Sequence, residues 1–162
     1  MLQSFRRLNL DTCAVIYFLD ETGPYRELVG DAFRLAAAGR LELVLPGIAQ
    51  MELLVGPLRR GRPDLVETVI DVTERFPNLR VAEMSRRVLL AAAAIRAASG
   101  LKAPDALIVA TAAVERCDAT LGNDGDCWRR ASAVPEVTLP GAAGALAVPP
   151  YLRLSDYVAA TT

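Results

Sequence analysis

Short apolar segments separated by longer, helix-compatible segments are the feature that most constrains how this chain can fold. Four segments have the length and composition of buried strands: Leu8–Leu10, Leu41–Leu45, Leu79–Glu83 and Ala119–Leu121. Strands that alternate with helices along a chain are typical of a parallel sheet covered by helices. The pattern therefore predicts a parallel α/β layer fold.

Val137–Leu139 is the candidate for the fifth strand, and Tyr151–Leu154 competes with it for that place. The segment Pro140–Pro150 between them is rich in glycine, alanine and proline, which predicts a loop without regular structure.

Gly56-Pro57 predicts a helix stop. Helices are predicted at Ala14–Leu19, Pro24–Ala38, Ile48–Val55, Asp64–Arg75, Arg86–Ala98, Pro104–Glu115 and Cys127–Ala131.

The length of 162 residues favours one domain with a substantial core. Hydrophobic residues make up 52% of the chain and charged residues 23%, which is typical of a compact fold and not of a disordered chain. No linker divides the sequence. We therefore expect a single domain over residues 1–162.

The chain contains no histidine. Catalysis by Ser-His-Asp or Cys-His groups, and zinc sites that need histidine, are therefore excluded. A metal ion would have to be held mostly by oxygen ligands, which favours Mg²⁺ or Mn²⁺. The net charge of −1 gives no global attraction to nucleic acid, so local clusters of charge must supply it.

The cysteines and the longest uncharged run bear on location. Cys13, Cys117 and Cys127 are odd in number and lack paired metal-ligand spacing, so we expect free thiols in a reducing compartment, two of them in the core. No signal peptide is recognisable at the N-terminus. The longest uncharged run, Val137–Leu152, is too short and too interrupted by glycine and proline for a membrane span. We expect a cytoplasmic protein without a membrane partner.

Acidic residues fall where an open α/β sheet binds its ligands, beyond the carboxyl ends of the strands. Asp11 ends the first strand, Glu52 lies in the helix after the second, Asp105 begins a helix, and Asp124 and Asp126 follow the fourth strand. Each has a structural alternative, because aspartate suits helix N-termini and turns. Glu52 is the hardest to explain in this way. Its helix is otherwise nearly uncharged, so we expect it to point into a cleft or toward a partner.

The chemistry of carboxylates gives a reason for such a cluster. Acidic side chains close together repel one another unless a cation lies between them. Mg²⁺ keeps several water ligands, so a few carboxylates suffice to hold it. A bound metal ion polarises a phosphodiester and lowers the pKa of a bound water, which cleaves nucleic acid without histidine. A phosphatase with an aspartate nucleophile fits poorly, because Asp11-Thr12-Cys13 lacks the required second aspartate two residues on.

At these residues the chain resembles the PIN-domain family, close to the toxin ribonucleases of the VapC type. The resemblance rests on Asp11-Thr12, on Glu52 followed by Gly56, on Pro104–Ala112 and on Asn123–Asp126. It extends over a core of about residues 8–157 and implies an α/β fold, a three-layer α/β/α sandwich with a mostly parallel five-stranded sheet. It further implies a Mg²⁺- or Mn²⁺-dependent endoribonuclease, the toxin of a type II toxin–antitoxin pair, with a cognate antitoxin and a homodimeric state.

The resemblance also implies roles for individual residues. The expected catalytic acids are Asp11, Glu52, Asp105 and Asp124, and the expected metal ligands are Asp11, Asp105 and Asp124, with Asp126 as an auxiliary. The last motif departs from the family pattern, because Gly122 stands in place of a threonine and Cys127 in place of an aromatic residue. These departures leave open whether Asp124 or Asp126 is the main ligand.

Thr12, Arg129 and Arg130 are the candidates for contact with RNA. Arginine suits phosphate recognition, although a solvated helix face explains the two arginines equally well. The segment Pro140–Pro150 has no counterpart in the family pattern, and we expect it to be an inserted loop. The alternative function is a PIN-fold module that binds RNA or a partner with little or no catalysis. The four acids argue against that alternative, and Gly122 argues mildly for it.

Overall fold

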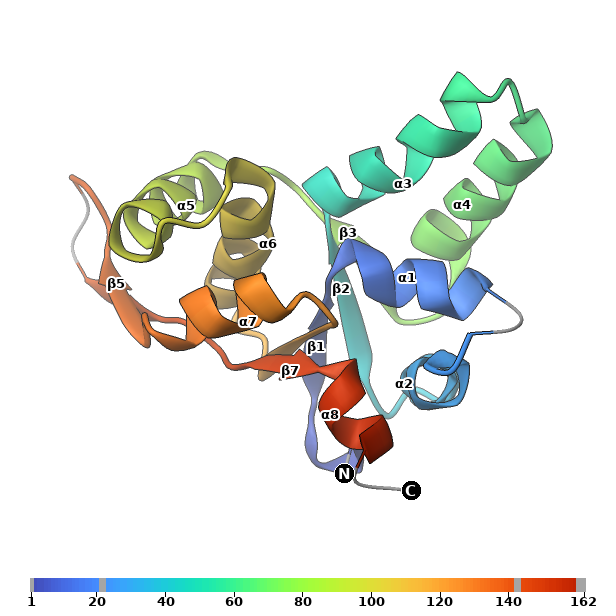
Figure 1. Ribbon diagram of the computed structural model, residues 1–162, viewed down its shortest axis with the longest axis horizontal. Helices are drawn as coiled ribbons and strands as arrows, with labels where there is room; N and C mark the ends of the chain where they lie inside the picture. The colour runs from blue at the N-terminus through green and yellow to red at the C-terminus, as the bar shows by residue number, and fades with distance from the viewer. Residues whose placement is uncertain (1, 21–22, 142–143, 160–162) are drawn as a thin grey trace.

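A five-stranded parallel sheet forms the centre of the molecule (Figure 1). The structure is a computed structural model that describes residues 2–20, 23–141 and 144–159. The strands lie in the order β3-β2-β1-β4-β7, and every pairing in this sheet is parallel. Their bounds are Arg7–Leu10 for β1, Glu42–Pro46 for β2, Leu79–Ala82 for β3, Ala119–Gly122 for β4 and Tyr151–Arg153 for β7.

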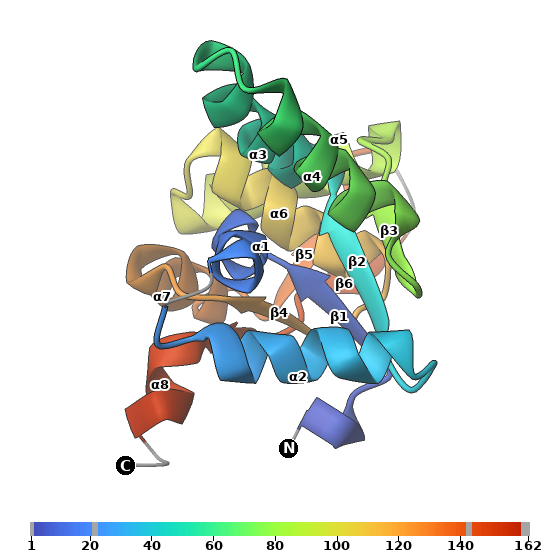
Figure 2. The same cartoon turned by 90° about the vertical axis from the view of Figure 1, so that its right-hand side faces the viewer.

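Helices cover both faces of the sheet, which confirms the three-layer α/β/α architecture (Figure 1). Figure 2 looks onto the first face, where α2 crosses in front of the strands. The first core cluster is built with α1 (Thr12–Leu19), α2 (Arg26–Ala37), α3 (Gly47–Arg59) and α4 (Pro63–Arg75), and the second with α5 (Arg86–Ser99), α6 (Ala103–Val114) and α7 (Gly125–Ser132). A short 3₁₀ turn (Leu2–Ser4) and α8 (Leu154–Ala159) lie near the two termini.

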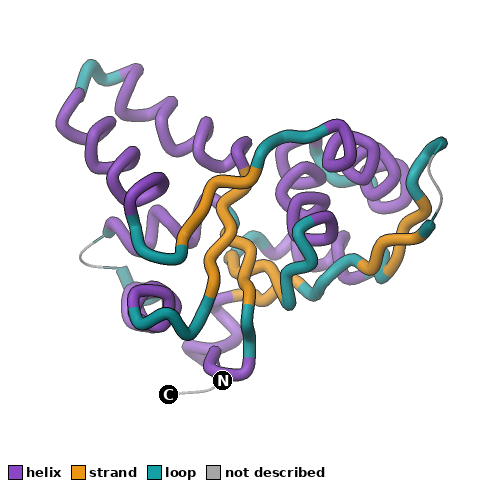
Figure 3. The backbone as a smooth tube through the Cα atoms, turned by 180° about the vertical axis from the view of Figure 1, so that it is seen from behind, coloured by secondary structure: helices purple, strands orange, loops and turns teal. Residues whose placement is uncertain are grey.

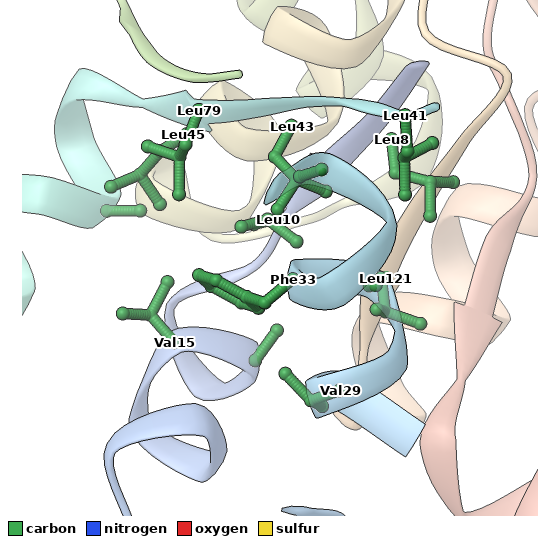
Figure 4. Packing of buried hydrophobic residues seen from close by; sticks show 14 of the residues in the cluster. Leu8, Leu10, Val15, Val29, Phe33, Leu41, Leu43, Leu45, Leu79 and Leu121 are labelled. Carbon is green, nitrogen blue, oxygen red and sulfur yellow. The ribbon is translucent and has the colours of Figure 1, made fainter. Parts of the chain in front are cut away.

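The strand side chains alternate between these two layers. Leu43 and Leu45 of β2 belong to the first cluster, whereas Val44 between them packs with Ala112 of α6 on the other face. Phe33 of α2 is fully buried at the centre of the first cluster (Figure 4). Successive residues of a strand point to opposite faces, so a continuous apolar run is what a sheet covered on both sides requires.

The strand that pairs with β4 shows which of the two candidates is the fifth strand of the sheet. Tyr151–Arg153 forms β7 and pairs with β4, so Tyr151–Leu154 was the correct alternative and Val137–Leu139 was not. The latter region forms β5 (Glu136–Thr138), which pairs antiparallel with β6 (Ala145–Ala147) outside the main sheet (Figure 3). A short apolar segment does not specify its partner, because pairing depends on contacts distant in sequence.

The prediction of an unstructured loop at Pro140–Pro150 is wrong in part, because β6 lies within it. Residues 142–143 of that loop lie outside the described residues. The predicted helix stop at Gly56-Pro57 is also wrong. Helix α3 continues through the buried Pro57 to Arg59, and its end is marked by Gly61, which has a φ of +60°. Proline removes one helical hydrogen bond, but tertiary packing against α4 outweighs that local cost.

The three cysteines are free, with Cys117 and Cys127 buried and Cys13 half-buried, as expected. Within the described residues, no single helix has the length and apolar composition to cross a membrane. Among the same described residues, one pair of consecutive helices, α5 and α6, reaches that length and composition when taken together, with a bend of 119° at the break between them.

Candidate functional site

Three of the five acidic side chains singled out in the sequence meet in one pocket at the carboxyl end of the sheet. Asp11 follows β1 directly, Asp124 lies two residues after β4, and Asp105 lies in the first turn of α6. The pocket has a volume of about 340 Å³ and is lined by Asp11, Thr12, Cys13, Ile16, Tyr17, Asp105, Asn123 and Asp124. Parallel strands direct their carboxyl ends to the same edge, which is why residues a hundred positions apart converge there.

Asp11 is the most enclosed of these acids, with 9% of its surface exposed. It occupies the N-cap position of α1, but its side chain makes no capping hydrogen bond. Instead its Oδ2 accepts a hydrogen bond of 2.5 Å from Tyr151 Oη. Burial raises the pKa of the Asp11 carboxyl, the hydrogen bond from Tyr151 opposes this, and the charges of Asp105 and Asp124 raise it further. Capping therefore does not explain this carboxylate.

The pKa of the Asp105 carboxyl is raised for the same kind of reason as that of Asp11. Burial raises its pKa, and the negative charges of Asp124 and Glu52 add to the effect, while Lys102 opposes it. Its place at the positive end of α6 would by itself favour the ionised form. The mutual repulsion of Asp105 and Asp124 indicates a site that favours a positive charge.

The contacts of Asp124 and Asp126 are different, although the two are only two residues apart. Asp124 is the N-cap of α7, where its Oδ1 accepts hydrogen bonds of 2.8 Å from the amides of Asp126 and Cys127. Asp126 is exposed, does not line the pocket, and forms ion pairs with Arg129 and Arg130. The hydrogen bond from Arg130 lowers the pKa of Asp126. The structure thus brings Asp124 to the other acids and directs Asp126 to the helix surface.

Glu52 is connected to the pocket through Thr12. The Thr12 hydroxyl donates a hydrogen bond of 2.5 Å to Glu52 Oε2, and this contact joins α1 to α3. Glu52 does not line the pocket itself, yet its charge contributes to the raised pKa of Asp105. Glu52 therefore lies at the margin of the acidic cluster. The Thr12 hydroxyl proton is directed to that carboxylate.

Two further residues of the pocket have defined roles in its architecture. Asn123 Oδ1 accepts a hydrogen bond of 2.9 Å from the amide of Ser155, so the start of α8 is tied to the loop after β4. Burial raises the pKa of the Cys13 thiol to about 12, which keeps it protonated at neutral pH. A protonated thiol is a poor nucleophile and a poor metal ligand. The reactive groups of the pocket are thus its oxygen atoms.

The donor set fits a hydrated hard cation. Within the described residues, no group of three or more histidine, cysteine, aspartate or glutamate side chains is placed so that it could hold a metal ion as the side chains now lie. Three carboxylates nevertheless line one pocket, where the charge of Asp124 helps to raise the pKa of both Asp11 and Asp105. Mg²⁺ keeps several water ligands and usually binds through only one or two carboxylates. An open site of this kind therefore suits Mg²⁺ better than a closed cage of protein ligands would.

Tyr151 is the residue of this site that the sequence did not reveal. In the sequence Tyr151 stands out only as part of a candidate strand, and nothing nearby distinguishes it from a core tyrosine. Its contact with Asp11 joins residues 140 positions apart. Only the pairing of β7 with β4 brings it there.

Comparison with known proteins gives the family of the chain. The chain belongs to the PIN domain family, whose family model matches residues 9–133. No curated protein matches the chain in sequence. The matched range includes the four expected catalytic acids and ends before β7.

Solved structures with a similar fold come from toxin–antitoxin systems. A chain of VapBC2 from Rickettsia felis, bound to a DNA fragment from their promoter, has a TM-score of 0.65 and 14% identity, with coverage of 91% of this chain and 98% of that chain. DNA-bound VapBC from Salmonella typhimurium gives 0.63 and 15%, with coverage of 92% and 98%. A toxin–antitoxin complex from Klebsiella pneumoniae gives 0.54 and 20%, with coverage of 73% and 86%. At these identities the likeness establishes the fold.

Proposed function

We propose that this protein is a Mg²⁺- or Mn²⁺-dependent endoribonuclease of the VapC type, the toxin of a type II toxin–antitoxin pair. The observation that carries the proposal is the convergence of Asp11, Asp105 and Asp124 on one pocket of a PIN domain. The likeness in fold to chains of VapBC complexes supports the toxin assignment. The free thiols fit the proposed cytoplasmic location.

Asp11, Asp105 and Asp124 would hold the metal ion, with Glu52 as the fourth catalytic acid at the margin. When bound, the ion would polarise the phosphodiester and lower the pKa of the attacking water. Thr12 fixes the Glu52 carboxylate by a hydrogen bond, and the backbone amides of α7 fix Asp124. Side chains held in this way keep their geometry when substrate enters.

RNA contact by Arg129 and Arg130 requires that they leave Asp126. Both ion pairs are at the surface, and the side chain of Asp126 is 52% exposed. Exposed ion pairs contribute at most about 1 kcal/mol, so a phosphate can compete for these arginines. Asp126 lies in the first turn of α7 and pairs with the two arginines of its last turn, so in this proposal it orients them and is not the auxiliary metal ligand that the resemblance implies.

An apolar stripe on α3 supports a protein partner. Met51, Val55 and Leu58 are 52%, 41% and 63% exposed and follow one another at spacings of four and three residues. Large apolar side chains on one exposed helix face mark interaction surfaces. A cognate antitoxin and a second copy of the chain are the proposed partners.

Cleavage of a structured RNA in the presence of Mg²⁺ or Mn²⁺ tests the proposal. We expect Asp11→Asn and Asp105→Asn to lower the cleavage rate by about 100-fold or more, because each removes a charge that holds the ion. Asp64→Asn is the matched control, since Asp64 lies on α4 and pairs with Arg62 at the surface. If wild type and both pocket variants cleave equally fast, the activity is a contaminant and the proposal fails.

Metal binding separates the proposal from its alternative, a PIN-fold module without catalysis. Calorimetric titration with Mn²⁺ should show binding to the wild type and to Asp64→Asn, with much weaker binding to Asp11→Asn. A wild type that binds no Mn²⁺ at millimolar concentration would favour the binding module.

A further inference from the structure

The hydroxyl of Tyr151 connects two of the segments that form the pocket. Tyr151 is 3% exposed, and its ring packs in the second core cluster. Its Oη donates a hydrogen bond of 2.5 Å to Asp11 Oδ2 and accepts one of 3.1 Å from the amide of Asp124. A single hydroxyl thus joins the end of β1 to the loop after β4, with both its donor and its acceptor capacity used.

Space for this hydroxyl exists only because residue 122 is a glycine. A Cβ atom at Gly122 would lie 2.1 Å from Tyr151 Oη and 2.6 Å from its Cζ. The φ of Gly122 is not in the left-handed region, so its backbone would accept other residues. Steric exclusion by Tyr151, together with Asp11 Cβ at 2.8 Å, therefore accounts for the glycine. The same exclusion explains why a threonine does not precede the last acid pair in this chain.

We propose that Tyr151 is a positioning residue that orients the Asp11 carboxylate for metal binding. The inference rests on the proposed function. Tyr151 holds Oδ2 and so fixes the rotation of the carboxylate, which leaves Oδ1 as the oxygen not engaged by the tyrosine. Carboxylate ligands depend on such outer hydrogen bonds for their orientation, and loss of one weakens metal binding by about 10- to 100-fold.

If Tyr151 orients Asp11, the C-terminal segment that contains β7 contributes a side chain to the site. Tyr151 lies beyond residues 9–133, the range matched by the PIN family model. The segment has a second connection to the pocket, because the amide of Ser155 binds Asn123 Oδ1. Strand β7 is therefore the outer strand of the sheet next to β4, and it also places the Tyr151 hydroxyl against Asp11.

Mn²⁺ affinity of Tyr151→Phe, measured by calorimetry on the full chain, tests the inference. The variant keeps the buried ring and removes only the hydroxyl. Tyr25→Phe is the matched control, because Tyr25 contacts the Tyr17 ring and is not among the residues that line the pocket. We expect affinity to fall about 10-fold or more in Tyr151→Phe and to stay at the wild-type value in Tyr25→Phe.

The outcomes separate the two proposals. A wild type that binds no Mn²⁺ overturns the proposed function and this inference with it. A wild type that binds Mn²⁺ with the same affinity as Tyr151→Phe leaves the proposed function standing and overturns the positioning role. Thermal unfolding of both variants checks that a change in affinity does not come from loss of the fold.

Relocation of the hydroxyl gives an independent test. Tyr151→Leu vacates the space next to Gly122, and we expect it to weaken Mn²⁺ binding as Tyr151→Phe does. Gly122→Ser in the Tyr151→Leu background places a hydroxyl beside Asp11 from the neighbouring strand. The new Cβ would lie 2.8 Å from Asp11 Cβ, so Gly122→Ala in the same background is the control for that close contact, and we expect the serine variant to bind Mn²⁺ more tightly than the alanine variant. A serine double variant that binds Mn²⁺ no more tightly than the alanine double variant would contradict the claim that a hydroxyl at this point orients Asp11.

Discussion

At the scale of single residues, the pocket is shaped by what each carboxylate contacts. Asp124 and Asp126 are nearly equivalent in sequence, yet one caps α7 at the pocket and the other pairs with two arginines. Asp11 is at a capping position, yet its side chain makes no capping hydrogen bond and accepts one from Tyr151 instead. Residue type and position therefore restrict the candidates, and the hydrogen-bond partners distinguish among them.

Gly122→Ala tests the packing at this point. We expect it to lower the free energy of unfolding by about 2 kcal/mol, because the new methyl group would overlap Tyr151 Oη and approach Asp11 Cβ at 2.8 Å. Urea denaturation measures the change. Gly125→Ala is the control, since its Cβ would meet only Arg153 Nη1 at 3.4 Å, the end of a flexible side chain. Equal stability of the two variants would show that the site has room for a side chain at 122.

At the scale of elements, a network of ion pairs connects three neighbouring strands near their amino ends, opposite to the pocket. Glu42 of β2 accepts hydrogen bonds of 2.7 Å from Arg7 Nε of β1 and 2.8 Å from Arg80 Nε of β3. Arg80 also binds the Glu115 carboxylate, directly after α6. Burial raises the pKa of Glu42, but the hydrogen bonds from Arg80 and Arg7 outweigh it, and the pKa ends below its ordinary value.

The pH dependence of stability follows from that direction. A carboxyl whose pKa is lower in the folded state stabilises the fold above its unfolded pKa and loses this effect as the pH falls through the folded pKa. We expect Glu42→Gln to lower the free energy of unfolding by about 0.5–1 kcal/mol at pH 7, and the difference to shrink below pH 4.5, the ordinary value for this group.

Urea denaturation of Glu42→Gln and wild type across this pH range measures the effect. Asp64→Asn serves as the comparison, because the Arg62–Asp64 pair is local to one helix end and should matter less. A difference between wild type and Glu42→Gln that does not depend on pH would contradict the role given to the ionised carboxylate.

At the scale of the whole molecule, one sheet separates two apolar layers and belongs to both. Phe33 of the first layer stacks on Phe18 with ring centroids 3.7 Å apart and meets the edge of Phe76. Trp128, the single tryptophan, lies on α7 of the other layer. Tyr151 packs in the second cluster and Leu154, three residues on, in the first. The C-terminal segment therefore connects the layers across the sheet edge.

A variant in one layer should destabilise the other if residues 1–162 form a single domain. We expect Phe33→Ala to lower the free energy of unfolding by about 3–5 kcal/mol, because it leaves a cavity among buried rings. Trp128 fluorescence and far-ultraviolet circular dichroism should report the same shifted midpoint. A fluorescence midpoint that stays at the wild-type value would show that the layers unfold independently.

The sequence by itself determined the α/β class, four of the five strands of the main sheet and the acids that meet in the pocket. These features depend on local periodicity and on the rule that parallel strands end at one edge, and both can be recognised in a single sequence. Tertiary structure decided the partner of the last strand, the course of α3 through Pro57, and the separation of Asp124 from Asp126. It also placed Tyr151 on Asp11 and so explained Gly122. Contacts between residues 140 positions apart have no periodicity along the chain, because they exist only once the sheet has assembled.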